Sequence, residues 1–157
     1  MVSYSPNIIT LCVDAYDVEH QSGRLYHQYT SGAVSFTSLM EAFARMDHLY
    51  DELQLPQAAV RIRSFQVDRR KMEQAIKRGR IPKLPEYRRK EMKIMEAFDK
   101  VTEQRGRDST FIIHVKYRQN ASWQGEVTWV DKQKKEYFRS ALELVRLIDS
   151  AMGETEK

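Results

Sequence analysis

The sequence predicts an α+β fold in which a strand–strand–strand–helix unit occurs twice, on either side of an inserted basic helical segment. Residues 9–52 align without a gap with residues 111–154, at an offset of 102 positions, and seven of the 44 aligned pairs are identical. Alternating apolar residues, a turn glycine (Gly23 and Gly125) and a helical pattern stay in register in both segments. A period this long exceeds that of solenoid repeats, so we interpret the pattern as an internal duplication.

Each predicted unit has one apolar sheet face and one apolar helix stripe, so two units must cover each other or share a sheet. We therefore expect an antiparallel sheet with pseudo-twofold symmetry, in one compact domain of 157 residues. The first βββα repeat is placed at residues 1–57 and the second at residues 109–157. An inserted strand and basic helical arm occupy residues 58–108.

In the first repeat, alternating apolar residues at 9–15 are typical of a half-buried strand. Gly23 is taken to end the following turn, so the second strand is placed at 24–29. A short third strand leads to Phe36.

The second repeat follows the same order. Strands are expected at 111–117 and 123–130, and a charged hairpin at 131–135 leads to Phe138.

A helix closes each repeat. Ser38 with Glu41, and Ser140 with Glu143, have the spacing of a capping box, so each helix should begin one residue after its serine. The predicted buried faces are Leu39, Phe43, Met46 and Tyr50, with Met40 and Leu49 beside them, and Leu142, Val145, Ile148 and Met152. With these we expect Phe36, Phe138 and Trp129 in the core.

The inserted segment reads as a strand at 58–65, a helix at 69–78 and a longer helix that starts near Pro85 and ends at Gly106. Its charge is the main asymmetry of the chain. Residues 1–60 carry two basic and seven acidic side chains, residues 61–108 sixteen and eight, and residues 109–157 eight and seven, within a net charge of +4. A segment this basic suits an acidic protein surface, a protein complex or a phosphate backbone.

Few residue patterns suggest catalysis or metal binding. The four histidines lack metal-ligand spacing, and neither a phosphate-binding glycine loop nor a nucleophile motif is present. Cys12 and His114 occupy equivalent positions in the two repeats, which leaves open a Cys–His pair or two ordinary sheet residues. Glu41 and Glu143 are better explained by capping than as paired carboxylates. We predict no cofactor and no metal.

Two regions are candidate binding sites. The turn after the first strand of the second repeat gathers aromatic and planar hydrogen-bonding side chains, which suit recognition of a peptide or a base. The alternative interpretation of this turn is a well-packed hairpin. The other region is the basic arm, a line of cationic side chains of the kind that binds phosphates. The candidate residues are Arg69, Arg70, Arg88, Arg89, Lys93, Arg118, Gln119, Asn120 and Trp123.

We therefore expect a non-enzymatic binding or regulatory protein, an adaptor or inhibitor that acts through protein–protein contacts. The alternative is a nucleic-acid-binding protein that uses residues 61–108 and the turn from Arg118 to Trp123. The single cysteine, Cys12, rules out an intrachain disulfide, and the first apolar run is too short for a membrane span. The cytoplasm is the expected location, with no membrane contact, and the sequence does not predict an oligomeric state.

Overall fold

The computed structural model describes residues 5, 7–29, 32–54, 56, 98–118 and 122–155. Its strands form a six-stranded sheet in the order β3-β2-β1-β4-β5-β6, and every neighbouring pair is antiparallel. The expected α+β class with an antiparallel sheet is confirmed. The elements are β1 (Ile9–Tyr16), β2 (Gln21–Tyr26), β3 (Val34–Phe36), α1 (Leu39–Leu53), β4 (Ser109–Tyr117), β5 (Gln124–Trp129), the 3-10 turn η3 (Val130–Lys132), β6 (Lys134–Phe138) and α4 (Ala141–Thr155).

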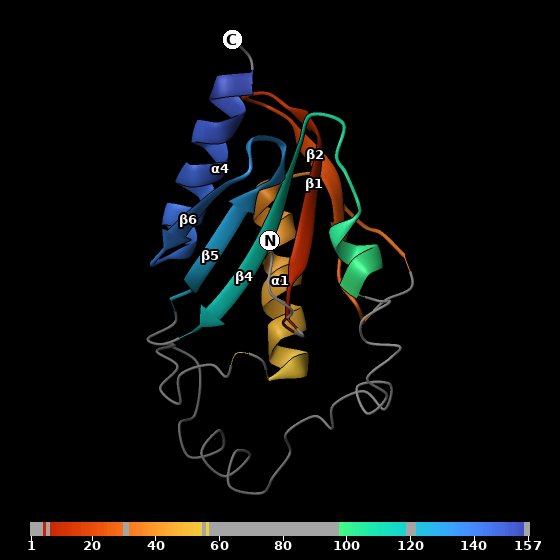
Figure 1. Cartoon of the computed structure of the whole chain (residues 1–157), viewed down its shortest axis with the longest axis vertical. Coiled ribbons are helices and arrows are strands. Elements are labelled where there is room, and N and C mark those ends of the chain that lie inside the picture. Colours follow the sequence, from red (N-terminus) through yellow and green to blue (C-terminus); the bar gives the residue numbers. More distant parts are fainter. Residues whose placement is uncertain are drawn as a thin grey trace, which may run out of the picture.

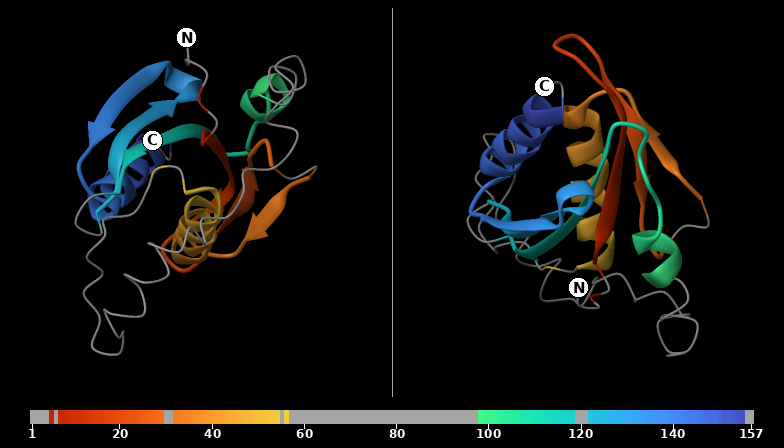
Figure 2. Two further views of the ribbon diagram at one scale, coloured as in Figure 1. Left: turned by 90° about the horizontal axis from the view of Figure 1, so that it is seen from below. Right: turned by 45° about the horizontal axis from the view of Figure 1, so that its top comes forward.

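Both long helices, α1 and α4, lie on the same face of the sheet (Figure 1), and the left view of Figure 2 shows them beneath it. The core fills the space between them and the sheet. Every second residue of β1 and β4 points into it, because side chains alternate between the two faces of a strand. These buried residues are Ile9, Leu11, Val13, Phe111, Ile113 and Val115.

The central strands β1 and β4 pair symmetrically about one pair of residues. Thr10 lies opposite Ile112, with Ile9 opposite Ile113 and Leu11 opposite Phe111. Thr10 and Ile112 are themselves 102 positions apart, which is the offset of the sequence alignment. The outer pairings recur at the same offset, because Gly23 pairs with Phe36 and Gly125 pairs with Phe138.

The predicted position of the second strand was wrong. We placed it at 24–29, but β2 begins at Gln21 and contains Gly23. Glycine is needed there for contact within the sheet, because a Cβ on Gly23 would lie 2.0 Å from the carbonyl oxygen of Cys12. A Cβ on Gly125 would likewise lie 2.0 Å from the carbonyl oxygen of His114. Each glycine lies beside a register shift of its strand pair. A β-bulge therefore explains both glycines.

The helices α1 and α4 begin at the residues that the two capping boxes predicted. Ser38 Oγ accepts a hydrogen bond from Glu41 N at 3.1 Å, and Ser140 Oγ accepts one from Glu143 N at 3.0 Å. In a capping box the glutamate side chain accepts a hydrogen bond from the backbone amide of the N-cap serine. Here Glu41 Oε2 instead accepts from the amide and the hydroxyl of Thr37, the residue before Ser38. These bonds, and then Arg45, lower the pKa of Glu41 to about 2.

The buried face of α4 differs from the prediction. Leu142 is 61% exposed, and its first-half counterpart Met40 is 81% exposed. Phe43 and Val145, which we expected in the core, are half-buried. The expected burial of Phe36, Met46, Phe138, Ile148 and Trp129 is confirmed. The buried helix residues are Leu39, Ala42, Met46, Leu49, Tyr50 and Leu53 in α1, and Leu144, Ile148, Ala151 and Met152 in α4.

The opposite face of the sheet is partly covered by residues 98–108, drawn in green in Figures 1 and 2. Residues 98–102 are helical, and Phe98 packs with Ile8 and Ile112. Thr10 Oγ1 donates to the carbonyl of Val101 at 2.8 Å, which fixes this segment near the centre of the sheet. The expected strand at 58–65, the helix at 69–78 and most of the long helix lie outside the described residues. Within the described part of the chain, no helix has the length and apolar character needed to cross a membrane.

Candidate functional site

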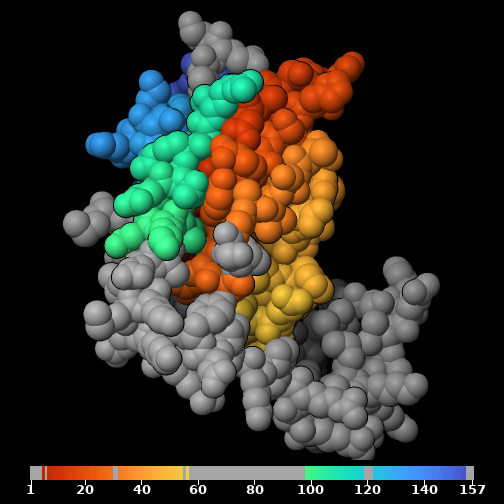
Figure 3. All heavy atoms as spheres, turned by 90° about the vertical axis from the view of Figure 1, so that its right-hand side faces the viewer, coloured from red at the N-terminus to blue at the C-terminus, as the bar shows by residue number. Residues whose placement is uncertain are grey.

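A groove of about 430 Å³ lies between α1 and the strands of the first half. In Figure 3, α1 (yellow) and these strands (red to orange) lie side by side on one face of the molecule. The floor of the groove is made of buried apolar side chains from β1, β2 and α1, which are Ile9, Leu25, Met46 and Leu49. The remaining lining residues are His27, Val34, Glu41, Ala44, Arg45, His48 and Glu52.

Charged side chains of α1 form the rim of this groove. Arg45 Nη2 lies 2.9 Å from Glu41 Oε1, and His48 Nε2 lies 3.1 Å from Glu52 Oε1. Both pairs are four residues apart, so they run along the helix surface beside the groove. The rim can therefore contact polar or charged groups while the floor receives an apolar side chain.

His27 lines the groove, as does Glu52. Burial lowers the pKa of His27 to about 4, and the nearby carboxylate of Glu52 only partly offsets this. The imidazole is therefore neutral near pH 7. Its Nδ1 accepts the backbone N–H of Tyr29 at 3.2 Å, so the proton of the neutral ring is assigned to Nε2. His27 thus offers a neutral donor in the lining of an apolar groove.

The second half has a groove at the equivalent place, but it is smaller, at about 200 Å³. Eight of its nine lining residues lie 102 positions after a residue that lines the first groove. Trp129 occupies the position of His27, and Phe111 occupies the position of Ile9. The two rings stack with centroids 6.4 Å apart. In the second half, the side chains of Phe111 and Trp129 therefore occupy the space that stays open in the first half.

Arg118, a predicted binding residue, is 4% exposed and bonded to the end of α1. It donates to Asp51 Oδ1 at 2.7 Å and to the carbonyl of Pro56 at 2.8 Å, with a longer contact of 3.4 Å to Asp47. Its guanidinium lies over the ring of Tyr50. These contacts engage Nε and Nη1, whereas the buried Nη2 has no hydrogen-bond partner among the described residues.

Trp123 from the same turn is also buried. Its ring packs against Phe43 and Tyr50, and its Nε1 donates to Asp47 at 3.3 Å. The equivalent of Asp47 in the second half, Asp149, accepts a bond from Tyr16 at 2.7 Å. Each aspartate thus ties a helix to the end of a central strand from the other half. The other predicted binding residues, Arg69, Arg70, Arg88, Arg89, Lys93, Gln119 and Asn120, lie outside the described residues.

The hypothesis of a Cys12–His114 pair was wrong. Cys12 lies opposite Thr110, whereas His114 lies opposite Glu126 on the next strand. Cys12 and His114 are separated because β1 and β4 are antiparallel. Residues 102 positions apart lie opposite each other only at Thr10 and Ile112, and pairs farther along the strands lie progressively farther apart. Burial raises the pKa of the Cys12 thiol to about 11, so the thiolate is scarce near neutral pH.

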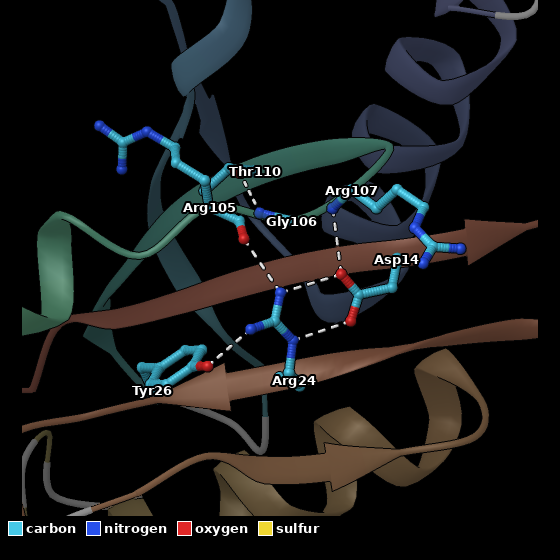
Figure 4. Close-up of polar contacts among 7 residues, drawn as sticks. All are labelled: Asp14, Arg24, Tyr26, Arg105, Gly106, Arg107 and Thr110. Atoms are coloured by element: carbon cyan, nitrogen blue, oxygen red, sulfur yellow. Dashed lines mark hydrogen bonds and ion pairs between the residues drawn. The ribbon is translucent and has the colours of Figure 1, made fainter.

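A polar cluster on the other sheet face anchors the segment that follows residue 102 (Figure 4). The Arg24 guanidinium donates to both carboxylate oxygens of Asp14, at 2.8 and 2.9 Å, to Tyr26 Oη and to the carbonyl of Arg105. Asp14 also accepts the backbone N–H of Arg107 at 3.0 Å. The hydrogen bond from Arg24 is the main cause that lowers the pKa of Asp14. Each guanidinium nitrogen of Arg24 and both carboxylate oxygens of Asp14 are bonded within the cluster, so we assign it to structure.

The second half repeats this ion pair with the charges exchanged. Lys116 and Glu126, which are 102 positions after Asp14 and Arg24, form an ion pair, and Lys135 contacts the same carboxylate at 3.1 Å. Among the described residues, no group of three or more metal-ligating side chains is close enough to hold a metal ion. The apolar groove of the first half is therefore our candidate functional site.

Comparison of the chain with protein-family models, with curated protein sequences and with solved structures finds no significant match. The function is therefore inferred from the geometry of the site. The groove was not predicted from the sequence, because its lining residues come from three strands and a helix and form no local motif. One feature of the sequence could have pointed to the groove. His27 aligns with Trp129, so the first half has a smaller side chain where the second half has an indole.

Proposed function

We propose that the protein is a non-enzymatic binding protein, an adaptor or inhibitor that acts through protein–protein contacts, and that the groove beside α1 is its contact site. The observation that supports this most directly is the difference between the two grooves. The second is largely filled by Trp129 and Phe111, whereas the first is about twice as large and has an apolar floor. Partner proteins commonly place apolar anchor residues in such sites.

We also propose that the two halves arose by internal duplication of a βββα unit and that only the first half kept an open groove. The constant offset of strand pairing and helix starts supports this. We also propose the cytoplasm as the location, because a single cysteine cannot form an intrachain disulfide of the kind common in secreted proteins.

The proposal is tested by filling the groove. His27→Trp introduces the side chain that the second half already accommodates at the equivalent position. Ser150→Trp places the same bulk beside the second groove and serves as the control. Each variant and the unmodified protein are immobilised, exposed to an extract of the cells that produce the protein, and the captured proteins are identified by mass spectrometry.

We expect one protein to be captured by the unmodified chain and by Ser150→Trp, and to be lost with His27→Trp. Equal capture by all three baits, or no specific capture by any of them, contradicts the proposal.

Nucleic-acid binding through the basic arm is the second candidate function. It is supported by the charge of residues 61–108, sixteen basic against eight acidic side chains. Such a segment gains affinity for phosphate backbones by releasing counterions.

A further inference from the structure

We infer that the groove beside α1 receives an aromatic side chain of a partner protein, of the size of an indole and flanked by lysine or arginine. This inference rests on the proposed function and names the chemistry of the partner. It follows from three observations, which are the occupant of the equivalent groove, the walls of the open groove and the charge of its rim.

The second half shows what fits at this place in the fold. Trp129 is 8% exposed, its ring stacks on Phe111 at an interplanar angle of 21°, and its Nε1 donates to Ser109 Oγ at 2.7 Å. The strands around it have the same pairing register as those of the first groove. An indole is therefore a side chain that the space between the helix and the strands accommodates in this fold.

The first groove provides matching walls without that side chain. Ile9 and His27 replace Phe111 and Trp129, so the floor stays apolar while the volume increases to about 430 Å³. A flat aromatic ring fills such a slot with little loss of conformational entropy, because its side chain has two rotatable bonds. The N–H assigned to His27 Nε2 can donate to a main-chain carbonyl of the same partner segment.

The rim sets the charge of the residues beside the aromatic ring. Glu52 lies next to His27, is 61% exposed at its side chain, and has the imidazole of His48 as its ion-pair partner. Among the lining residues of the groove, Glu41 and Glu52 are acidic and Arg45 is basic. Because Arg45 pairs with Glu41, the carboxylate of Glu52 is left as the excess charge of the rim. Residues 1–60 as a whole carry seven acidic and two basic side chains. A partner with cations next to its aromatic anchor is complementary to this surface.

Three short peptides test the inference on the full chain. They are the acetylated and amidated tripeptides Lys-Trp-Lys, Glu-Trp-Glu and Lys-Ala-Lys, titrated into isotope-labelled protein and followed by NMR chemical shifts. We expect Lys-Trp-Lys to shift the resonances of Leu25, Met46 and Leu49. Lys-Ala-Lys should bind at least about tenfold more weakly, because the anchor is missing, and Glu-Trp-Glu about two- to fivefold more weakly, because of rim repulsion.

Two variants and a control make the assignment specific. His27→Trp should abolish the shifts, because it fills the groove from within. Glu52→Lys changes an exposed side chain, and should reverse the preference between the Lys-Trp-Lys and Glu-Trp-Glu peptides. It therefore keeps the test decisive if His27→Trp fails to fold. Glu154→Lys is the matched control, since Glu154 is the equivalent residue at the second groove, and it should leave all three affinities unchanged.

Equal shifts from all three peptides, or shifts centred away from the groove, overturn the inference. So does an unmodified protein that dimerises in light scattering while His27→Trp is monomeric, because the occupant is then a second copy of the chain. Loss of a captured protein with His27→Trp, together with no Lys-Trp-Lys binding, would reject this partner chemistry and retain the proposed function.

Discussion

Thr10 and Ile112 lie directly opposite each other in the central strand pair and are also equivalent residues of the two halves. The pseudo-twofold axis passes through this pair. Residues that follow Thr10 in β1 and residues that follow Ile112 in β4 therefore lie toward opposite ends of the sheet. This arrangement explains why Asp47 and Asp149 each bond a side chain at the end of the other half's strand. The segment at 98–102 breaks the symmetry, because Thr10 bonds to the carbonyl of Val101 while Ile112 packs against Phe98.

The strand glycines give a stability prediction. Gly125→Ala places a Cβ 2.0 Å from the carbonyl oxygen of His114, which is backbone and cannot rotate away. We expect a loss of at least about 2 kcal/mol in the free energy of unfolding, measured by urea denaturation. Gly153→Ala is the control, because its added Cβ would meet no described atom within 4 Å beyond its chain neighbours and its own helix backbone. It should stabilise α4 by about 0.5–1 kcal/mol. Equal effects of the two changes would contradict the strand geometry.

The helix caps give a second prediction. Ser38→Ala and Ser140→Ala each remove a bond to the first turn of a helix, and each should cost about 1 kcal/mol in thermal or chemical denaturation. Ser150→Ala, on the exposed surface of α4, is a control that should change stability by less than about 0.5 kcal/mol. Unchanged stability in both cap variants would mean that these serines do not hold the helix starts.

Arg118 gives a third prediction. Arg118→Ala leaves Asp47, Asp51 and the carbonyl of Pro56 without their shared donor. Both carboxylates are more than half exposed and regain water, so we expect about 2–3 kcal/mol of destabilisation, below the usual cost of breaking a fully buried pair. Tyr16→Phe, which removes the bond to Asp149, should cost less than Arg118→Ala in the same assay. The reverse order would show that Arg118 is not a structural tie.

Local patterns predicted the order of the elements well. Alternation gave β1 and β4, and the two serines gave both helix starts, because these signals depend on neighbours in the sequence. The role of Gly23 was not predictable in this way, since its requirement comes from the carbonyl of Cys12 on the adjacent strand. Leu142 was misplaced because α4 carries two overlapping apolar stripes, and packing against the sheet selects the one that contains Leu144.

The candidate site was less accessible from the sequence than the fold was. Arg118 and Trp123 attracted attention by residue type, yet both are used in packing the end of α1. The groove is open because His27 is smaller than Trp129 at the equivalent position. A smaller side chain at one position is not a recognisable sequence motif. The groove became visible only when the three strands and α1 were placed together.

His27 gives a pH-dependent prediction. The folded protein keeps this imidazole neutral down to its lowered pKa of about 4, whereas the unfolded chain takes up a proton near the ordinary value of 6.5. Lowering the pH from about 7 to about 4 therefore favours the unfolded state, by at most about 3 kcal/mol from this group. We expect His27→Gln to lose less stability over this range in urea melts. Carboxylates such as Asp14 contribute equally in both proteins, so identical pH profiles would contradict the burial of His27.

The last prediction separates the two candidate functions. We expect no micromolar binding of duplex or single-stranded DNA or RNA in fluorescence anisotropy at about 0.15 M salt. Micromolar binding that weakens as salt increases would instead support the basic arm as the primary site. In that case Arg88→Glu combined with Arg89→Glu should reduce the slope of log K against log salt by about two, if each arginine contacts one phosphate. Arg139→Glu with Arg146→Glu makes the same change of charge outside residues 61–108 and should leave the slope unchanged.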